Sequence, residues 1–425
     1  MIRIMKYGVE SNENIFARSS SAKDVSSMVS VILDNVRTGG DDALRDYTKR
    51  FDGAEIDAIE VPASELKAAA TSMDKEFLRV LEKAADNIRA YHRHQVRNSF
   101  MISEQDGIVL GQKVVPVAVA GIYVPGGTAA YPSTVLMDTI PAKLAGCKQV
   151  IMVSPPGKDG KLNPAVLAAA YVAGVDRVFR IGGAQAIAAL AYGTETVPKA
   201  DKIVGPGNIY VAEAKKQVSG IVSIDMIAGP SEILIISDGK SNPKVIAADM
   251  LSQAEHDKNA SAVLITDSPD LASNVRYELE DQLGLLPREE IARASMETNG
   301  KIIIVYSIEK AIEISDALAP EHLEVCVDDP MAYLDKIHNA GSVFLGRDCP
   351  EALGDYLAGP NHTLPTSGTA RFSSPLSVDD FVKKYQFTYY TSKALSKVAS
   401  DIALFARKEG LEAHARSALV RGEVK

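Results

Sequence analysis

The amino-acid sequence predicts an α/β fold with two successive open parallel sheets, and three observations support this. Short apolar runs alternate with helical patterns from about residue 113 to about residue 345. Continuous apolar runs are typical of strands buried on both faces, as in parallel sheets. Glycine-rich turns follow two of these runs. The chain of 425 residues also exceeds the size at which one hydrophobic core stops growing, so several domains are expected.

The first part of the chain, residues 1–105, is expected to form a helical N-terminal extension. Its longest helix is predicted over residues 74–95, where apolar side chains repeat on one face. His92 and His94 are expected on the exposed side of that helix. The candidate helix caps are Ser64 and Ser72, and the candidate helix stops are Gly39-Gly40 and Gly53.

Two Rossmann-like units are expected to follow, over residues 106–230 and 231–374. No residue-level repeat relates them, so only their similar pattern suggests a duplication. The predicted strands are 114–124, 150–154, 177–181 and 202–204 in the first unit, and 233–237, 262–266, 301–306, 323–327 and 342–345 in the second. The predicted helices of the first unit include residues 142–144, 164–173, 184–192 and 208–218.

The last part of the chain, residues 375–425, is expected to form a small C-terminal extension. An extended stretch is predicted over residues 382–391 and a helix over residues 394–409. Gly410 is the expected stop of this helix, because glycine tolerates the left-handed conformation that often ends helices. The final fifteen residues are polar and are expected to be helical.

Composition excludes several classes of protein. The formal charge of −9 and the isoelectric point near 5.4 argue against nucleic acid or an anionic membrane as the main partner. No apolar run reaches the roughly 18 residues of a membrane span, and the N-terminus lacks a signal-peptide core. A cytoplasmic location is therefore expected. Cys147, Cys326 and Cys349 are too few and too widely spaced for a disulfide framework, so reduced thiols are expected.

Glu321 and His322 lie where a predicted helix gives way to a predicted strand. A histidine beside a carboxylate can move protons near neutral pH, so the pair is a candidate acid–base pair. A single Glu-His dipeptide is weak evidence, but three further clusters of ionisable residues strengthen it. They contain Gln253 with Glu255 and His256, Asp355 with His362, and Glu409 with His414.

The turns Val124-Pro125-Gly126-Gly127 and Gly205-Pro206-Gly207-Asn208 are candidate nucleotide contacts. Glycine lets the backbone approach a ligand, and the start of a helix attracts phosphate. Neither turn has the GxGxxG spacing, however. The alternative is that both are tight turns that only connect strands to helices.

Gln253 and His256 are spaced i, i+3 on a helix that Pro243 is expected to begin, so they share a face and could bind a divalent metal. Local hydrogen bonding is the alternative for such residues. Asp355 and His414 would complete a zinc site if the fold gathers them. The sequence has no HExxH motif, and Ser231 has no GxSxG context, which disfavours a metallopeptidase and a serine nucleophile.

Nine motifs, in order along most of the chain, resemble those of the histidinol dehydrogenase family. They are GIYVPGG at 121–127, IGGAQAI at 181–187, VGPGN at 204–208, AGPSE at 228–232, LSQAEH at 251–256, APEHL at 319–323, GDY at 354–356, GPNHTLP at 359–365 and EGLEAH at 409–414. The family oxidises L-histidinol to L-histidine through L-histidinaldehyde, the last step of histidine biosynthesis, with two NAD and one zinc ion per subunit.

The resemblance implies a role for each matching residue. Glu321 and His322 would be the catalytic acid–base pair. The family is an intertwined homodimer, so Glu409 and His414 would come from the second subunit. The implied zinc ligands are Gln253, His256, Asp355 and His414, which would also contact substrate together with Ser231, His322, His362 and Glu409; the implied NAD contacts are Tyr123, Gln185 and Asn208.

Two other functions are consistent with parts of the sequence. A related dehydrogenase of the same fold could oxidise another polar alcohol, such as a sulfonated diol, although Ser231, His362, Glu409 and His414 favour the imidazole-bearing substrate. A zinc hydrolase would use the same metal ligands with the α/β units as a scaffold only. The chain departs from the family after His256, where Lys258 stands in place of the usual proline. The loop geometry there is the feature the resemblance leaves open.

Overall fold

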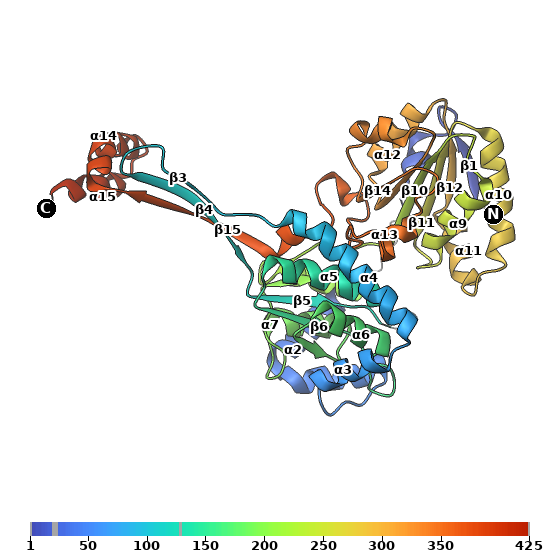
Figure 1. Cartoon of the computed structure of the whole chain (residues 1–425), viewed down its shortest axis with the longest axis horizontal. Helices are drawn as coiled ribbons and strands as arrows, with labels where there is room; N and C mark the ends of the chain where they lie inside the picture. The colour runs from blue at the N-terminus through green and yellow to red at the C-terminus, as the bar shows by residue number, and fades with distance from the viewer. Residues whose placement is uncertain (1, 19–23, 127–129, 424–425) are drawn as a thin grey trace. The chain divides into compact units, whose positions relative to one another are not determined.

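The computed structural model describes residues 2–18, 24–126 and 130–423, grouped in two units (Figure 1). Within these ranges, unit 1 comprises Met1–Gln95 and Ala118–Phe381, and unit 2 comprises Val96–Val117 and Val382–Lys425. Gly127, the last residue of the first predicted glycine turn, lies outside the described residues. No described helix has the length and apolarity needed to cross a membrane.

Unit 1 contains two α/β lobes, each with a six-stranded sheet. The first lobe holds residues 26–95 and 118–224, and the second holds residues 2–16 and 232–356. The sheet of the first lobe has the order β2 (Glu60–Val61), β7 (Arg177–Phe179), β6 (Gln149–Val153), β5 (Val119–Tyr123), β8 (Lys202–Val204) and β9 (Ser223–Ile224). The sheet of the second lobe has the order β1 (Arg3–Lys6), β12 (Lys301–Ile304), β11 (Ser261–Thr266), β10 (Glu232–Ser237), β13 (His322–Cys326) and β14 (Ser342–Leu345).

The two sheets have the same topology. If the five consecutive parallel strands of each lobe are numbered in chain order, both sheets run 3-2-1-4-5, and each carries one extra strand beside the third. The extra strand β2 is antiparallel, whereas the extra strand β1 is parallel. The two doubly wound units predicted from alternating apolar runs are confirmed, and their common strand order supports the duplication that their pattern suggested.

Helices cover both faces of each sheet (Figure 1). In the first lobe α4, α5 and α6 pack together on one face, and α2, α7 and α8 on the other. The helices of this lobe are α2 (Ser26–Tyr47), η1 (Thr48–Asp52), α3 (Ala63–Ser72), α4 (Lys75–His92), η2 (Arg93–Gln95), α5 (Pro132–Ala145), α6 (Pro164–Ala173), α7 (Gly183–Tyr192) and α8 (Ile209–Val218). Those of the second lobe are α1 (Asn12–Phe16), α9 (Pro243–Ala254), α10 (Pro269–Leu283), α11 (Glu289–Thr298), α12 (Ile308–Leu318), η3 (Pro330–Lys336) and α13 (Glu351–Tyr356).

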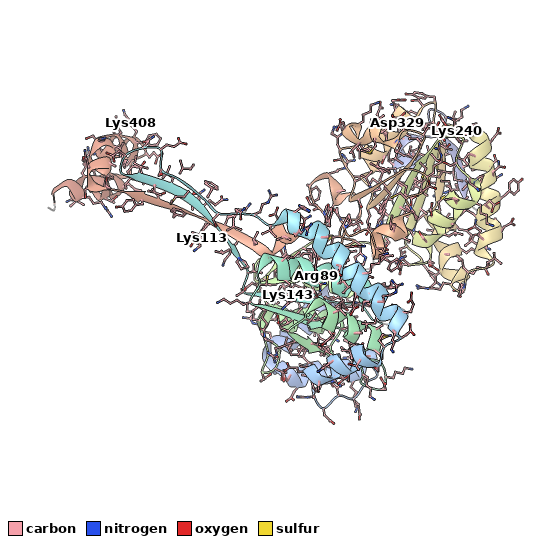
Figure 2. All side chains as sticks on the ribbon, in the orientation of Figure 1. Arg89, Lys113, Lys143, Lys240, Asp329 and Lys408 are labelled. Atoms are coloured by element: carbon pink, nitrogen blue, oxygen red, sulfur yellow. The ribbon has the colours of Figure 1, made fainter. Side chains whose placement is uncertain are left out.

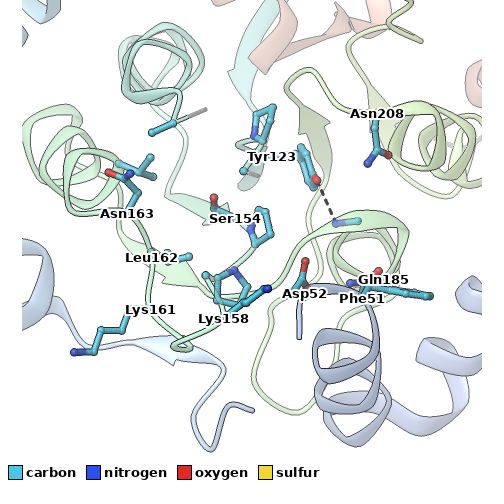
Figure 3. A pocket seen from close by; sticks show the side chains of 18 of the residues that line it. Phe51, Asp52, Tyr123, Ser154, Lys158, Lys161, Leu162, Asn163, Gln185 and Asn208 are labelled. Atoms are coloured by element: carbon cyan, nitrogen blue, oxygen red, sulfur yellow. Dashed lines mark hydrogen bonds between the residues drawn. The ribbon is translucent and has the colours of Figure 1, made fainter. Parts of the chain in front are cut away.

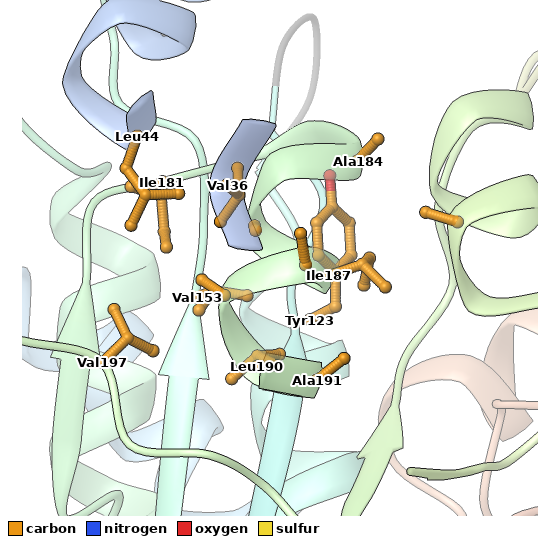
Figure 4. Packing of buried hydrophobic residues seen from close by; sticks show 14 of the residues in the cluster. Val36, Leu44, Tyr123, Val153, Ile181, Ala184, Ile187, Leu190, Ala191 and Val197 are labelled. Atoms are coloured by element: carbon orange, nitrogen blue, oxygen red, sulfur yellow. The ribbon is translucent and has the colours of Figure 1, made fainter. Parts of the chain in front are cut away.

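The core of the first lobe packs apolar side chains of α7 against the strands of the sheet (Figure 4). Helix α7 is built largely of alanine, which lets it approach β5 closely. The methyl groups of Leu190 fill the space above Gly121, where an added side chain would crowd them. Burial of a leucine side chain contributes about 1.5–3 kcal/mol to the free energy of unfolding. Charged side chains such as those of Arg89 and Lys240 lie on the outer surface (Figure 2).

Unit 2 is a three-stranded antiparallel sheet with two helices. Its elements are β3 (Phe100–Ile102), β4 (Ile108–Pro116), β15 (Val382–Tyr390), α14 (Ser392–Lys408) and α15 (Glu412–Glu423). The segment before it in unit 1 contains η4 (Thr369–Arg371) and η5 (Val378–Phe381). Gly410 has φ +78°, so it ends α14 as predicted.

Several sequence-based expectations differ from the structure. The single strand predicted over 114–124 is two strands, β4 and β5, which belong to different units, because β4 pairs with the distant β15. The N-terminal segment is not purely helical, since β1 joins the sheet of the second lobe. Ser64 and Ser72 are not caps: Pro62 and Asp74 precede α3 and α4 instead.

Two other predictions in the same region have mixed outcomes. Gly53 has φ +67° and ends the η1 turn as predicted, whereas α2 passes through Gly40 with a kink. The prediction that His92 is exposed was wrong. Its side chain is buried, and Nδ1 lies 2.6 Å from Gln95 Oε1. His94 is exposed as expected.

Candidate active site and dinucleotide pocket

A cavity of about 920 Å³ opens at the carboxyl ends of the strands of the first lobe (Figure 3). Ligands of doubly wound sheets bind at this edge, and the volume lies within the range of small-molecule pockets. Tyr123 is the last residue of β5, and its hydroxyl accepts a hydrogen bond of 3.1 Å from the backbone N–H of Gly183. Gln185 is buried in the first turn of α7, and its Oε1 has no hydrogen-bond partner among the described residues. A ligand donor would satisfy that oxygen.

Asn208 lines the same cavity at the start of α8. Its Oδ1 accepts from the backbone N–H groups of Tyr210 and Val211, at 3.0 and 3.2 Å, so it caps the helix. The structure therefore brings together all three residues expected to contact NAD. Gly126, from the other predicted turn, lines the cavity as well.

Position 205 in the turn that precedes Asn208 requires glycine for steric reasons. Its φ is +117°, and a side chain there would collide with the carbonyl oxygen of Tyr123. A buried Lys215–Asp225 ion pair holds its backbone. Gly205 N–H donates to Asp225 Oδ2 at 2.8 Å, and Lys215 Nζ donates to Gly205 O at 2.9 Å. The turn is thus fixed before any ligand arrives.

Asp52 is a pocket residue that the sequence did not indicate. It lines the cavity with Phe51 at the end of η1, where no motif marks it. Its Oδ2 is buried without a hydrogen-bond partner among the described residues. Burial raises the pKa of this carboxyl to about 6. A hydroxyl donor of a ligand would both satisfy the oxygen and favour the ionised form.

His322 is the first residue of β13, at the amino edge of the second sheet, next to Ile233 in β10. Its Nδ1 lies 3.1 Å from the backbone carbonyl oxygen of Glu232, so Nδ1 carries the proton and donates it. Nε2 is buried, has no hydrogen-bond partner in the described parts of the chain and lies 3.8 Å from Asp355 Oδ1. Burial lowers the pKa of His322. This tautomer leaves Nε2 with a free lone pair, as a general base requires.

Glu321 precedes His322 in the chain, and its carboxylate lies on the Nδ1 side of the imidazole ring. One carboxylate oxygen accepts from the backbone N–H of Glu232 at 2.8 Å and lies 3.7 Å from Nδ1 of His322. Burial, followed by the charge of Glu232, raises the pKa of Glu321 well above its usual value. The same backbone residue therefore positions both members of the predicted pair.

Asp355, one of the predicted metal ligands of unit 1, lies beside this histidine. Gln253 is in the last turn of α9, which begins at Pro243 as predicted, and His256 follows the helix end. The pKa of His256 is lowered, because the effect of burial exceeds the opposing effect of the nearby carboxylate of Glu351. Potential ligand atoms of His322, Glu351 and Asp355 lie within 4.8 Å of one another. Glu351 was not among the expected site residues, although it is one helical turn before Asp355, and that i, i+4 spacing was the available signal.

The remaining predicted substrate contacts are distributed differently. His362 joins the cluster: Nδ1 is 3.6 Å from Asp355 Oδ1, and Nε2 is 3.2 Å from the hydroxyl of Thr134 in α5. Burial lowers the pKa of His362 to about 4, so it is neutral near pH 7. Ser231 directly precedes β10, at the same sheet edge as His322. Glu409 and His414 are exposed residues of unit 2, so the geometry of unit 1 does not test them.

The residues of unit 1 fit a zinc ion. Zinc prefers imidazole nitrogen and carboxylate oxygen ligands, and such atoms converge here. Gln253 Oε1 is buried and finds no hydrogen-bond partner among the described residues. An uncompensated buried oxygen is costly, and a cation would compensate it.

The loop that departs from the family pattern is an ordered turn. Asp257 Oδ1 accepts from the backbone N–H of Asn259 at 2.8 Å, and Lys258 pairs with Glu290 at 2.8 Å on the surface. The turn therefore closes without the proline.

The thiols of Cys147 and Cys326 are not activated thiolates. Burial raises the pKa of Cys147 to about 11 and that of Cys326 further still. All three thiols are free, as expected.

A doubly wound chain with a cavity at the strand ends of one lobe and a buried acid–base cluster in the other has the features of a nucleotide-dependent oxidoreductase. The histidinol dehydrogenase family model matches residues 16–422. The chain therefore belongs to the histidinol dehydrogenase family, and the resemblance seen in the motifs is confirmed.

Individual relatives are similar over at least 92% of the chain. Histidinol dehydrogenase of Clostridium acetobutylicum is 53% identical over 426 residues, which cover 99% of each chain. The Bacillus cereus enzyme of the same name is 56% identical over 392 residues, covering 92% of this chain and 91% of its own. The crystal structure of histidinol dehydrogenase from Elizabethkingia anophelis superposes with a TM-score of 0.93 at 40% identity and covers 99% of this chain and 98% of that one.

Proposed function

We propose that this chain oxidises L-histidinol to L-histidine through L-histidinaldehyde, in two NAD-dependent steps, in the cytoplasm. In the first step the alcohol loses a hydroxyl proton and a hydride. In the second step, water adds to the aldehyde, and the resulting hydrate loses a hydroxyl proton and a hydride to give the carboxylic acid. The observation that carries the proposal is Nε2 of His322, a buried, neutral and unpartnered base among the ligand cluster of a histidinol dehydrogenase family member.

His322 is proposed to accept the alcohol proton at Nε2. The carbonyl of Glu232 holds the Nδ1 proton, so the ring cannot present the wrong nitrogen. Glu321 is proposed to help remove a proton from water in the aldehyde step. Because both residues are nearly excluded from solvent, the aldehyde would meet the second step without leaving the site.

Gln253, His256, Asp355 and His414 are the proposed zinc ligands, and Ser231, His362 and Glu409 the proposed additional substrate contacts. A bound zinc ion would supply a positive centre that orients the amine and imidazole of the substrate. Tyr123, Gln185 and Asn208 would hold NAD, which accepts the hydride. The residues of the chain therefore bind, orient and deprotonate the substrate.

The homodimer is proposed from the surface of unit 2. Among its described residues, the buried apolar cluster consists of Ala403, Ala406 and Ala415 with Leu419 packed against them, a small core for an independent unit. Large apolar side chains are exposed on it, including Phe100, Met101, Tyr389, Leu404 and Phe405. A second copy of the chain would cover them, and Glu409 and His414 would then complete the partner's site.

The test of the activity is NADH absorbance with L-histidinol, together with the ratio of NADH to histidine. The proposal expects two NADH per histidine and little free aldehyde. Faster turnover of a sulfonated diol would favour a related dehydrogenase. Ester or amide cleavage without NADH formation would favour the hydrolase and contradict the proposal.

The shared site is tested by mixing chains that carry His256→Ala with chains that carry His414→Ala. If each site takes one histidine from each subunit, a mixed dimer has one intact site. Random re-pairing of equal amounts should restore about a quarter of wild-type activity, because about half of the dimers are mixed. If mixed dimers form and activity is not restored, His414 acts within its own chain.

A further inference from the structure

The segment that carries His362 is fastened to helix α5 of the first lobe at three successive residues. Asn361 Nδ2 donates to a backbone carbonyl oxygen of α5 at 2.6 Å, and the hydroxyl of Thr363 donates to Asp138 Oδ1 at 2.7 Å. Between these two bonds, Nε2 of His362 lies 3.2 Å from the hydroxyl of Thr134. Thr134 and Asp138 are buried and spaced i, i+4, so they share one face of the helix. The first lobe therefore holds a histidine that follows the last helix of the second lobe.

The surroundings of the His362 ring determine which nitrogen carries its proton. The ring is neutral near pH 7, so one nitrogen donates a hydrogen bond and the other accepts one. Nδ1 lies 3.6 Å from Oδ1 of Asp355, which as a metal ligand is a carboxylate. That oxygen would repel a bare nitrogen and attract an N–H group. Nδ1 therefore carries the proton, and Nε2 accepts a hydrogen bond from the hydroxyl of Thr134.

We propose that Thr134 is a positioning residue, whose hydroxyl fixes the ring of His362 so that Nδ1–H is presented to the substrate. This inference rests on the proposed contact between His362 and histidinol, and it adds a residue of the first lobe to that contact. The hydroxyl oxygen of histidinol and the carbonyl oxygen of the aldehyde both accept hydrogen bonds, so one N–H group can serve both steps. In the other tautomer a bare nitrogen would face these oxygens.

Helix α5 also borders the cofactor cavity. The helix begins at Pro132, and Ala130, two residues earlier, lines the cavity. Hydride transfer needs the substrate carbon and the nicotinamide ring in a fixed geometry. A substrate contact that is fastened to this helix would set the substrate relative to NAD as well as relative to the metal ligands.

The experiment measures the histidinol dissociation constant of the full-length, zinc-loaded protein by calorimetry without NAD, so that no turnover occurs. Thr134→Val keeps the branched shape but removes the hydroxyl, and the dissociation constant should rise about tenfold, the effect of one lost hydrogen bond. Thr134→Ser keeps the hydroxyl and should bind histidinol nearly as wild type does. Zinc content and NAD affinity should be the same in all variants.

Thr139→Val is the matched control. Thr139 is another buried threonine of α5, and its hydroxyl has no hydrogen-bond partner among the described residues. Its replacement should leave histidinol binding unchanged. Unchanged binding in Thr134→Val would overturn the proposal. An equal loss in Thr139→Val or in Thr134→Ser would also overturn it, because packing of the helix and not the hydroxyl of Thr134 would then be responsible.

A second measurement needs no change at Thr134. Nitrogen NMR of zinc-loaded protein with isotope-labelled histidine distinguishes a protonated ring nitrogen from a bare one, and the signals of His362 are those lost in His362→Asn. The proposal expects the proton on Nδ1 in the wild-type protein. A proton on Nε2 would overturn it, because Thr134 would then accept the hydrogen bond and would not fix the ring in the required form.

Two further results separate this inference from the function on which it rests. If the wild-type protein does not bind histidinol, the proposed function and the role of Thr134 both fail. If wild type and His362→Ala bind histidinol equally well, the contact of His362 and the role of Thr134 fail, while the dehydrogenase assignment remains. If His362→Ala weakens binding and Thr134→Val does not, only the role of Thr134 fails.

Discussion

The two lobes of unit 1 share one strand order but place their functional groups at opposite edges of the sheet. In the first lobe the carboxyl edge carries the cavity lined by Tyr123, Gln185 and Asn208. In the second lobe His322 and Ser231 lie at the amino edge. Topology alone therefore does not locate a site, because the residues at the strand ends decide which edge is open.

The carboxyl edge of the second sheet is closed by a network of charges. Arg347, which follows β14, makes a bidentate pair with Asp238 at 2.6 and 2.7 Å and a further pair with Asp328 at 2.8 Å. Asp238 and Asp328 follow β10 and β13, so the arginine spans the strand ends where a nucleotide would bind in the other lobe. Glycine turns leave that space free in the first lobe.

The largest expected effect comes from the amino edge of the second lobe. His322→Asn removes the base but keeps a polar side chain of similar size. Turnover should fall by about two to four orders of magnitude, the usual contribution of a general base, with zinc content and NAD affinity retained. Steady-state kinetics with metal analysis would check this. Near-normal turnover would mean that the second lobe does not supply the base.

A smaller effect is expected at the carboxyl edge of the first lobe. Gln185→Ala removes a buried amide that lines the pocket, and the NAD dissociation constant should rise about tenfold, since one hydrogen bond is worth about 1.4 kcal/mol. Tyr171→Phe, an exposed tyrosine on a helix of the same lobe, is the control. Equal NAD affinity in both variants would remove Gln185 from the cofactor site.

Asp52 should make NAD affinity depend on pH. Its pKa of about 6 lies above the ordinary 3.8, so the free pocket holds a proton below about pH 6 and a carboxylate above it. If a cofactor hydroxyl donates to the carboxylate, NAD affinity should weaken several-fold as the pH falls from about 7.5 to about 5. The raised pKa stabilises the fold in acid, and this contribution is lost as the pH rises through 6. Asp52→Asn should flatten both profiles, and an unchanged pH dependence of NAD affinity would contradict the contact.

The smallest effect on activity is expected from the closed edge. Arg347→Met breaks the network and should lower the free energy of unfolding by about 1–3 kcal/mol, because charged hydrogen bonds are lost in a half-buried place. The NAD dissociation constant should not change. Denaturant unfolding and NAD titration on the same preparation would test both parts. A large loss of NAD affinity would show that this edge, too, serves the cofactor.

The sequence predicted most of the strands of both lobes to within one or two residues, because buried parallel strands are continuous apolar runs. It did not predict that β4 pairs with β15 or that β1 joins the second sheet. Those contacts join residues far apart in the chain, and no local pattern records them.

The site shows the same limit. Motif resemblance indicated Gln253, His256 and Asp355, and the structure places Asp355 next to His322. Glu351 and Asp52 were missed because neither stands in a motif, and their roles depend on burial and on the groups they face. The burial of His92 was missed for the same reason.

The central claim is that the first lobe binds NAD and the second lobe holds the base and the metal ligands. It is tested most directly by the NAD dissociation constant of zinc-free protein, measured by calorimetry for Gln185→Ala and Asp355→Ala side by side. Well-separated sites contribute independently, so we expect the NAD dissociation constant to rise about tenfold for Gln185→Ala and to stay close to wild type for Asp355→Ala. The opposite pattern, with NAD affinity lost in Asp355→Ala and kept in Gln185→Ala, would contradict the assignment of the cofactor to the first lobe.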